Sequence, residues 1–316
     1  MDAITLSDIR AAAVRIKPYA HRTPVFTSRY IDDRTGGHVF FKAENLQKVG
    51  AFKFRGACNA VFSLSDEEAR RGVTTHSSGN HAQAVALSAK LRGIPATIVM
   101  NRTAPRVKRA AVEDYGATVV PVEPTEAARK AGVEEVVART NAVFIHPFND
   151  RRVIAGQGTA ALELIEDHGP FDVIVAPVGG GGLLSGMALA TKALLPGADV
   201  IAAEPAGADD ASRSLRDGVI HPMPQPNTIA DGLLTSLGEL TFAVIRQHVR
   251  EIVTVTDAEI VTAMRTVWER MKIIIEPSAA VPVAALLHGK VNIRGKKVGV
   301  ILSGGNVDLD KLPWMK

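Results

Sequence analysis

The sequence has little that would tie it to a secreted, membrane-bound or nucleic-acid-binding protein. Its 316 residues include one cysteine, Cys58, so no disulfide can form within the chain, which fits a reducing cytoplasm. No apolar run approaches the ~20 residues of a membrane helix, and no N-terminal stretch resembles a signal peptide. Basic and acidic residues are interspersed, so the net charge of +4 indicates no nucleic-acid surface. We therefore expect a cytoplasmic protein with neither membrane nor nucleic-acid partners.

From Gly72 onward, short β-branched runs alternate with alanine-rich stretches of helical pattern. The runs lie at 73–75, 96–100, 118–120 and 142–145, and the alternation resumes near residue 172 and ends with the run 297–302. Strands that alternate with helices predict parallel, doubly wound sheets. We therefore predict an α/β protein with two such domains. The small domain would span 72–149, and the large domain would combine 1–71 with 150–316.

The stretch 51–57 places a lysine in an unusual setting. Lys53 lies between Phe52 and Phe54, where a loop ends and a helix is expected to begin. The positive end of the helix dipole disfavours an ammonium group there, and aromatic neighbours that desolvate the amine lower its pKa further. A lysine kept neutral in this way attacks carbonyl groups and forms Schiff bases. Taken alone, the stretch is still better explained by an ordinary surface lysine.

Three further motifs follow predicted strands. Residues 179–182 are four consecutive glycines between a strand and a helix, an arrangement that lets backbone N–H groups converge on a phosphate. Residues 77–81 also open a helix, and residues 303–306 end the last strand. Each motif alone could be a turn or a helix cap, and the glycines nearly satisfy a dinucleotide fingerprint. Because ligands of parallel sheets bind at the carboxyl ends of strands, one pocket could collect all of them with Lys53. That combination suggests pyridoxal phosphate.

Together these motifs resemble the fold-type II pyridoxal-phosphate enzymes, the tryptophan synthase β family. Within that family the chain is most similar to the serine racemase and serine/threonine dehydratase branch. The likeness covers nearly the whole chain and includes residues 75–81, 155–159, 203–205, 229–232, 267–272 and 302–309. It implies that the cofactor lies in the cleft between two parallel-sheet domains. We also expect a homodimer.

The resemblance implies roles for individual residues. Lys53 would hold the cofactor covalently, and Ser78 would be a second acid/base on the opposite face. A serine at position 303 cannot protonate the pyridine nitrogen as a carboxylic acid would, and the weaker electron sink suits β-elimination. The cofactor would contact Phe52, Lys53, Asn80, Gly179, Gly180, Gly181, Gly182 and Ser303. The substrate would contact Ser77, Asn80, His81 and Arg129, although Arg129 could equally be a solvated helix residue.

A metal site is implied as well. Glu204, Asp210 and the backbone carbonyl of Ala208 match positions that bind a divalent cation in serine racemase. Oxygen ligands suit Mg²⁺ or Ca²⁺, and Mn²⁺ is also compatible; the alternative is an acidic surface loop. Val49 stands where serine racemase has a threonine near its nucleotide site, which leaves nucleotide activation open. Ala51 stands where the family often has serine.

The implied function is an ammonia-lyase that converts β-hydroxy amino acids such as L-serine and L-threonine to a 2-oxo acid and ammonia. Serine racemisation through Ser78 is a second reaction open to it. One alternative is an ammonia-lyase for threo-3-hydroxyaspartate, whose second carboxylate Arg129 could meet. A hypothesis of a different class is a non-catalytic module that binds an amino acid or a dinucleotide. Lys53 argues against that module, which would have no need of a reactive amine.

Overall fold

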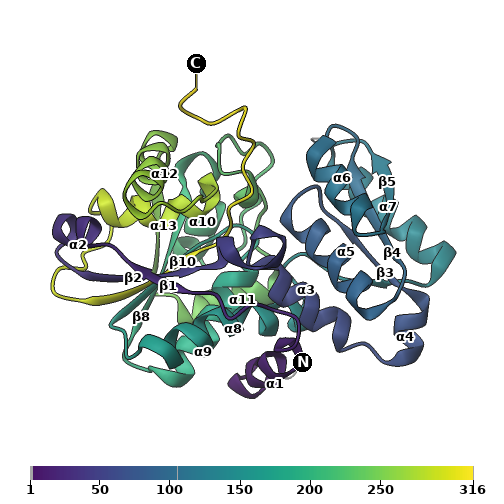
Figure 1. Ribbon diagram of the computed structural model, residues 1–316, viewed down its shortest axis with the longest axis horizontal. Coiled ribbons are helices and arrows are strands. Elements are labelled where there is room, and N and C mark those ends of the chain that lie inside the picture. The colour runs from purple at the N-terminus through teal and green to yellow at the C-terminus, as the bar shows by residue number, and fades with distance from the viewer. Residues whose placement is uncertain (1–2, 105, 316) are drawn as a thin grey trace.

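The computed structural model describes residues 3–104 and 106–315 (Figure 1). It contains two sheets. The larger has the strand order β1-β2-β10-β7-β8-β9, and the smaller has the order β5-β4-β3-β6. All neighbouring strands are parallel except β1 and β2, which are antiparallel. The predicted class, α/β with two parallel sheets, is confirmed, and the antiparallel edge strand β1 is a feature that the alternation did not predict.

The strands fall where the β-branched runs lie. Those of the larger sheet are β1 (Val25–Thr27), β2 (His38–Ala43), β7 (Val173–Pro177), β8 (Asp199–Pro205), β9 (Glu251–Val255) and β10 (Lys297–Leu302). Those of the smaller sheet are β3 (Val73–His76), β4 (Ala96–Asn101), β5 (Thr118–Val122) and β6 (Val143–Phe144).

Helices connect the strands. In the first half they are α1 (Leu6–Ile16), α2 (Arg29–Thr35), α3 (Lys53–Phe62), α4 (Asp66–Arg71), α5 (Asn80–Arg92), α6 (Arg106–Asp114) and α7 (Glu126–Thr140). In the second half they are α8 (Arg151–His168), α9 (Gly182–Leu194), α10 (Asp210–Asp217), α11 (Glu239–His248), α12 (Asp257–Met271) and α13 (Pro277–Leu287). Short 3-10 turns are η1 (Glu44–Leu46), η2 (Lys48–Gly50), η3 (Ala206–Ala208) and η4 (Asp231–Leu233). Among the described residues, no helix is both long and apolar enough to cross a bilayer.

The larger sheet is buried on both faces. All five residues of β7 are buried, and successive side chains belong to different cores: Val173 and Val175 pack in one, Ile174 and Ala176 in the other. Since neighbouring residues of a strand point to opposite faces, such a continuous apolar run marks a strand covered on both sides. One core includes side chains of α12 and α13, and the other includes side chains of α1, α8, α9 and α11.

The smaller sheet shares its core with α3. Phe54, Ala57 and Val61 of α3 pack in the same cluster as Val85 of α5 and Ile98 of β4, and α3 also contacts α8 beside the larger sheet. Figure 1 shows α3 between the two sheets. The strands of the smaller sheet lie between residues 73 and 144, inside the predicted small domain of 72–149. That domain boundary itself stays a prediction.

The registers align the carboxyl ends of the strands. Leu302 of β10 pairs with Ala43 of β2, and Pro177 of β7 pairs with Ala203 of β8. The segments that leave these ends contain Lys53, the four glycines and residues 303–306, and Glu204 is the penultimate residue of β8. In the smaller sheet, His76 at the end of β3 pairs with Val99 of β4. Because parallel sheets collect ligand-binding loops at this edge, the fold brings the predicted motifs to the place where a site is expected.

Candidate active site

Lys53 is the first residue of α3, as the sequence predicts. Its Nζ donates a hydrogen bond to the carbonyl oxygen of Pro147 at 3.0 Å and lies 5.2 Å from the centre of the Phe52 ring. Burial lowers the pKa of Lys53 to about 8, and the negative charge of Glu276 opposes part of that shift. With a pKa near 8, about a tenth of the amine is unprotonated at pH 7, far more than for an ordinary lysine.

The four glycines form a cup of free backbone donors. In the described part of the chain, no acceptor is present for the N–H groups of Gly179, Gly180, Gly181 and Gly182. Gly181 has a φ of 87°, which favours glycine, and a Cβ on Gly180 would overlap the Phe148 ring. Unpaired N–H groups at the N-terminus of α9 are suited to an anion such as a phosphate. The residues present therefore fit the phosphate of the expected cofactor.

Asn80 belongs to a hydrogen-bonded cluster from distant parts of the chain. Its Nδ2 donates to both carboxylate oxygens of Glu276, at 3.1 and 3.2 Å. Asn306 donates from Nδ2 to Asn80 Oδ1 at 2.8 Å and to the carbonyl of Val49 at 2.7 Å. Sequence reasoning missed Glu276, because a glutamate before the first proline of a helix looks like an ordinary helix start.

Ser303 lies beside the Lys53 segment. Its side chain is 2% exposed, and its carbonyl accepts a hydrogen bond from the N–H of Phe52 at 3.0 Å. The next residue, Gly304, forms an isolated bridge with Ala51. The end of β10 is thus joined to the residues that precede Lys53, which holds the predicted cofactor-binding serine close to the predicted cofactor-binding lysine.

The serines of residues 77–81 are held by local bonds. Ser78 Oγ accepts from the N–H of Asn101 at 3.0 Å, and Ser77 Oγ accepts from the N–H of Gly79 at 3.3 Å. Both hydroxyl protons therefore remain available for a ligand. Neither serine hydrogen-bonds Lys53 in the described part of the chain, so the predicted placement of Ser78 opposite Lys53 stays a prediction.

His81, which the sequence predicts to contact the substrate carboxylate, has a buried side chain, and that contact stays a prediction. Its ring is 2% exposed, and Nε2 lies 3.2 Å from the carbonyl of Ile145, to which it donates. Burial and the charge of Lys53 keep the pKa of His81 well below its usual value, so the ring is neutral. The remaining nitrogen, Nδ1, has no partner among the described residues and can only accept. The group of His81 that suits a substrate carboxylate is its backbone N–H near the start of α5.

Two further histidines lie near Lys53 and were not predicted from the sequence. The rings of His76 and His146 have centroids 5.9 Å apart. Burial lowers the pKa of both, that of His146 to about 4 with help from the charges of His76 and Lys53. The positive charge of Arg129 contributes to the shift of His76, which places Arg129 within electrostatic reach of this pair. The sequence does contain a signal that could have found them: each histidine comes immediately after a predicted strand, a common position for ligand-binding residues in α/β folds.

The predicted metal ligands are two buried carboxylates. Burial raises the pKa of Glu204 to about 9 and that of Asp210 to about 6. Both oxygens of Asp210 lack a partner among the described residues, whereas Glu204 accepts from the N–H groups of Ala211 and Ser212 at 3.0 and 2.9 Å. Ala208 is fully buried in η3. No group of three His, Cys, Asp or Glu side chains in the described residues is arranged for a metal. Two orphaned carboxylate oxygens nevertheless fit a hard cation whose other ligands are carbonyls and water.

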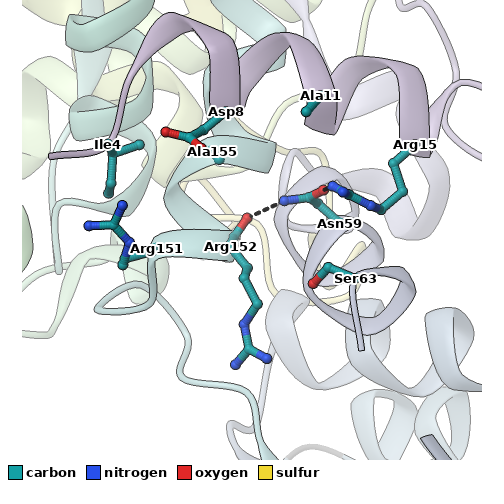
Figure 2. Close-up of a pocket in the computed structure, with 9 residues that line it drawn as sticks. All are labelled: Ile4, Asp8, Ala11, Arg15, Asn59, Ser63, Arg151, Arg152 and Ala155. Carbon is teal, nitrogen blue, oxygen red and sulfur yellow. Dashed lines mark hydrogen bonds between the residues drawn. The ribbon is translucent and has the colours of Figure 1, made fainter. Parts of the chain in front are cut away.

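A separate cavity of about 210 Å³ lies between α1, α3 and α8 (Figure 2). Asn59 crosses it: the amide accepts from Arg15 and donates to the carbonyl of Arg152 at 2.7 Å. None of the predicted site residues lines this cavity. The Asn59 bond links α3, the helix that begins with Lys53, to the first turn of α8.

Comparison with known proteins gives consistent results over nearly the whole chain. The model of a family described as "Pyridoxal-phosphate dependent enzyme" matches residues 16–304. A β-hydroxyaspartate dehydratase from Paracoccus denitrificans is 52% identical over 98% of this chain and 98% of its own length. An L-threo-3-hydroxyaspartate ammonia-lyase from Saccharomyces cerevisiae is 49% identical over 97% and 94%, respectively. The crystal structure of serine racemase from Dictyostelium discoideum has a TM-score of 0.94 and 51% identity, and covers 97% of this chain and 99% of that one.

Proposed function

The chain belongs to the family of pyridoxal-phosphate-dependent enzymes, and we propose that it is an ammonia-lyase for β-hydroxy amino acids. It converts substrates such as L-serine and L-threonine to a 2-oxo acid and ammonia. The observation that carries this proposal is the Lys53 amine, with a pKa near 8 and its Nζ held by the Pro147 carbonyl. A non-catalytic binding module, the hypothesis of a different class, does not fit a chain whose relatives are enzymes.

The cofactor, when bound, supplies an electron sink for the negative charge that develops at the substrate Cα. The residues of the chain supply the groups that hold the cofactor, the base and the groups that orient the substrate. The N–H groups of Gly179, Gly180, Gly181 and Gly182 hold the phosphate. Lys53 would anchor the cofactor and then, as a neutral amine, would take the Cα proton, while the β-hydroxyl leaves as water and hydrolysis releases the 2-oxo acid and ammonia. The side chains of Ser77 and Asn80 and the backbone N–H of His81 orient the substrate carboxylate.

Ser78 gives the site a second proton donor. Its Oγ accepts from the N–H of Asn101, so its own proton points elsewhere and is free to transfer. A donor on the face opposite Lys53 allows the proton to return with inverted configuration, which is racemisation. We therefore propose that elimination depends on Lys53 alone and that racemisation depends on Lys53 and Ser78 together.

Threo-3-hydroxyaspartate is the second candidate substrate, and the position of Arg129 favours it. The charge of Arg129 acts on His76, whose ring is next to that of His146, and the Pro147 carbonyl beyond it holds Lys53. A guanidinium within electrostatic reach of His76 can pair with a second carboxylate of the substrate. Three relatives carry names that refer to hydroxyaspartate.

We also propose a divalent cation, Mg²⁺ or Ca²⁺, at Glu204, Asp210 and the carbonyl of Ala208. It would stabilise this part of the large sheet rather than take part in the reaction. The proposal extends to a homodimer that acts in the cytoplasm on free amino acids, which size-exclusion chromatography with light scattering and cell fractionation can test.

The proposed function is tested by the release of 2-oxo acid and ammonia from the purified holoenzyme. The substrates are L-serine, D-serine, L-threonine and the threo and erythro forms of 3-hydroxyaspartate. Release from serine or threonine supports the first proposal, and a clearly higher kcat/KM for threo-3-hydroxyaspartate selects the second. A holoenzyme with bound cofactor that releases ammonia from none of these substrates would refute both.

A further inference from the structure

Residues 146–150 link β6 to α8 and contact several parts of the site. The carbonyl of Pro147 accepts the hydrogen bond of Lys53 at 3.0 Å. The ring of Phe148 fills the space in which a side chain on Gly180 would lie. The Oδ1 of Asn149 accepts a backbone N–H from the first turn of α11 at 2.9 Å. This short turn therefore contacts both the reactive lysine and the glycine cup.

His146 holds the turn from within. Its Nδ1 accepts the backbone N–H groups of Phe148 at 3.2 Å and Asn149 at 2.9 Å. The described residues offer these two N–H groups no other acceptor. Because a nitrogen that accepts must carry its lone pair, the proton of the neutral ring lies on Nε2. A proton on Nδ1 would face two N–H groups and would break both bonds.

The surroundings of the ring keep it in this form. Phe144, His76 and Phe148 contact it, and the Phe148 ring meets it edge-on with centroids 4.6 Å apart. Burial, together with the charges of His76, Lys53 and Lys130, lowers the pKa of His146 to about 4, although Asp150 opposes the shift. The ring is therefore neutral at physiological pH, and Nδ1 remains an acceptor.

We propose that His146 is a positioning residue whose Nδ1 fixes the turn that sets the Pro147 carbonyl against Lys53 and the Phe148 ring against the glycine cup. It touches neither the substrate nor the reacting atoms in this scheme. Its loss would let the carbonyl move away from the amine and the ring move away from Gly180. The consequence for turnover rests on the proposed function, whereas the consequence for cofactor binding can be measured without any substrate.

Three substitutions distinguish the effect of the Nδ1 acceptor from the effect of the ring itself. In His146→Asn, the amide oxygen can take the place of Nδ1 and accept the same two N–H groups. In His146→Gln, the amide reaches the position of Nε2, and in His146→Leu a side chain of similar width has no acceptor. We expect His146→Asn to lose less than about 5-fold in kcat, and the other two to lose about 10²-fold, the cost of a misplaced reacting group.

Cofactor binding provides readouts that a general loss of stability would not move. The cofactor contains the only phosphorus in the holoenzyme, so its ³¹P resonance reports the glycine cup directly. We expect His146→Gln and His146→Leu to shift this resonance and to raise the cofactor dissociation constant at least about 10-fold, as for a lost positioning contact. His146→Asn should stay close to the wild type in both. Melting temperatures show whether each variant is folded, and the Asn–Gln comparison stands if the Leu variant does not fold.

Two results would overturn the proposal. If His146→Gln and His146→Leu leave the ³¹P resonance, the cofactor dissociation constant and kcat unchanged, the turn does not depend on His146. If His146→Asn loses as much cofactor affinity and kcat as His146→Leu, the ring is needed but its Nδ1 acceptor is not. A wild-type enzyme that binds the cofactor but releases no ammonia would refute the proposed function instead, and the two binding measurements would still decide the role of His146.

Discussion

At the scale of single residues, burial has different consequences for ionisable groups because their partners differ. Lys53 has a backbone carbonyl and the more distant Glu276, so its pKa falls to about 8. Arg55, which is fully buried two residues later, is bonded to Glu44 and Glu163, and these carboxylates outweigh the effect of burial and raise its pKa. The same helix therefore carries one charge that is stabilised and one amine that readily becomes neutral. Only the second is suited to nucleophilic chemistry.

The first prediction is that Lys53→Ala abolishes turnover. The variant keeps the four glycine N–H groups, so it should still bind pyridoxal phosphate, but dialysis should remove the cofactor readily. The measurement combines ammonia release with the absorbance of protein-bound cofactor after dialysis. A matched control is Lys48→Ala, which removes a nearby lysine that is not assigned to the site. Wild-type ammonia release by purified Lys53→Ala would contradict the assignment of Lys53.

The second prediction concerns the pKa of Lys53. In cofactor-free protein, an acylating reagent reacts only with the neutral amine, so the rate of labelling at Lys53 should rise with pH to a midpoint near 8. An ordinary lysine has its midpoint near 10.4. The direction follows from burial, which favours the neutral form. Peptide mapping by mass spectrometry after timed labelling measures the labelling of Lys53 and of ordinary lysines in one sample. A midpoint above about 10 for Lys53, which is the range of ordinary lysines, would rule out the lowered pKa.

The sequence reveals a part of this site because some of its residues lie in local patterns. Lys53 between two aromatic residues and four consecutive glycines are visible without any structure. Pro147 and Glu276 were missed, because their roles arise from contacts with Lys53 and Asn80, which are 94 and 196 positions away. His146 was missed because its bonds to the N–H groups of Phe148 and Asn149 depend on the folded shape of the turn. The sequence also does not show which group of His81 is free, since only the structure shows that its Nε2 donates to the carbonyl of Ile145.

At the scale of elements, a buried ion cluster joins α3 to its surroundings. Arg55 of α3 donates to Glu44 of η1 at 2.7 Å and to Glu163 of α8 at 2.8 Å. Lys42 of β2 donates to the same Glu163 at 2.6 Å. Two positive and two negative groups thus balance in a region where none of the charged side chains is exposed beyond 14%. The cluster fixes the start of α3, and with it Lys53, against the larger sheet.

The third prediction follows from this cluster. Arg55→Met leaves Glu44 with only the hydroxyl of Thr23 and Glu163 with only Lys42, and removing one member of a buried pair costs about 3–5 kcal/mol. Arg22→Met is the control, because Arg22 is 51% exposed and its bonds to Glu166 and Asp167 are worth about 0–1 kcal/mol. Urea unfolding of both variants measures the two changes. If Arg55→Met and Arg22→Met lose similar amounts of free energy of unfolding, the buried cluster stabilises the fold no more than the exposed ion pairs of Arg22.

At the scale of the whole molecule, the alternation of strands and helices predicts the α/β class and both sheets, because parallel strands need helical crossovers. The alternation does not predict which of the two sheets a helix packs against. The predicted boundary at residue 72 assigns α3 to the large domain, whereas its apolar side chains pack with α5 and β4. Helix α3 contacts both halves, so an amphipathic pattern within it cannot decide between them. An extended segment is predicted from Pro24 and Val25, but its antiparallel pairing with β2 is not, because a strand of three residues is too short for a clear pattern.

The last prediction concerns the cation that we propose at Glu204 and Asp210. Without a cation, burial raises the pKa of Glu204 to about 9 and that of Asp210 to about 6. The folded chain then binds more protons than the unfolded chain between pH 4 and pH 9. Its stability therefore falls as pH rises through that window. A bound cation favours both carboxylates in their charged form and should remove this loss.

Mg²⁺ or Ca²⁺ should therefore raise the melting temperature of chelator-treated protein, and more at pH 8 than at pH 6. A concentration of 100 times the dissociation constant corresponds to about 2.7 kcal/mol. Glu204→Gln is the test variant, because it removes the charge and keeps the shape, and it should lose the response to the cation. Glu239→Gln, at the exposed start of α11, is the control and should keep it. If the cation stabilises the protein equally at both pH values, or stabilises Glu204→Gln as much as the wild type, these carboxylates are not its ligands.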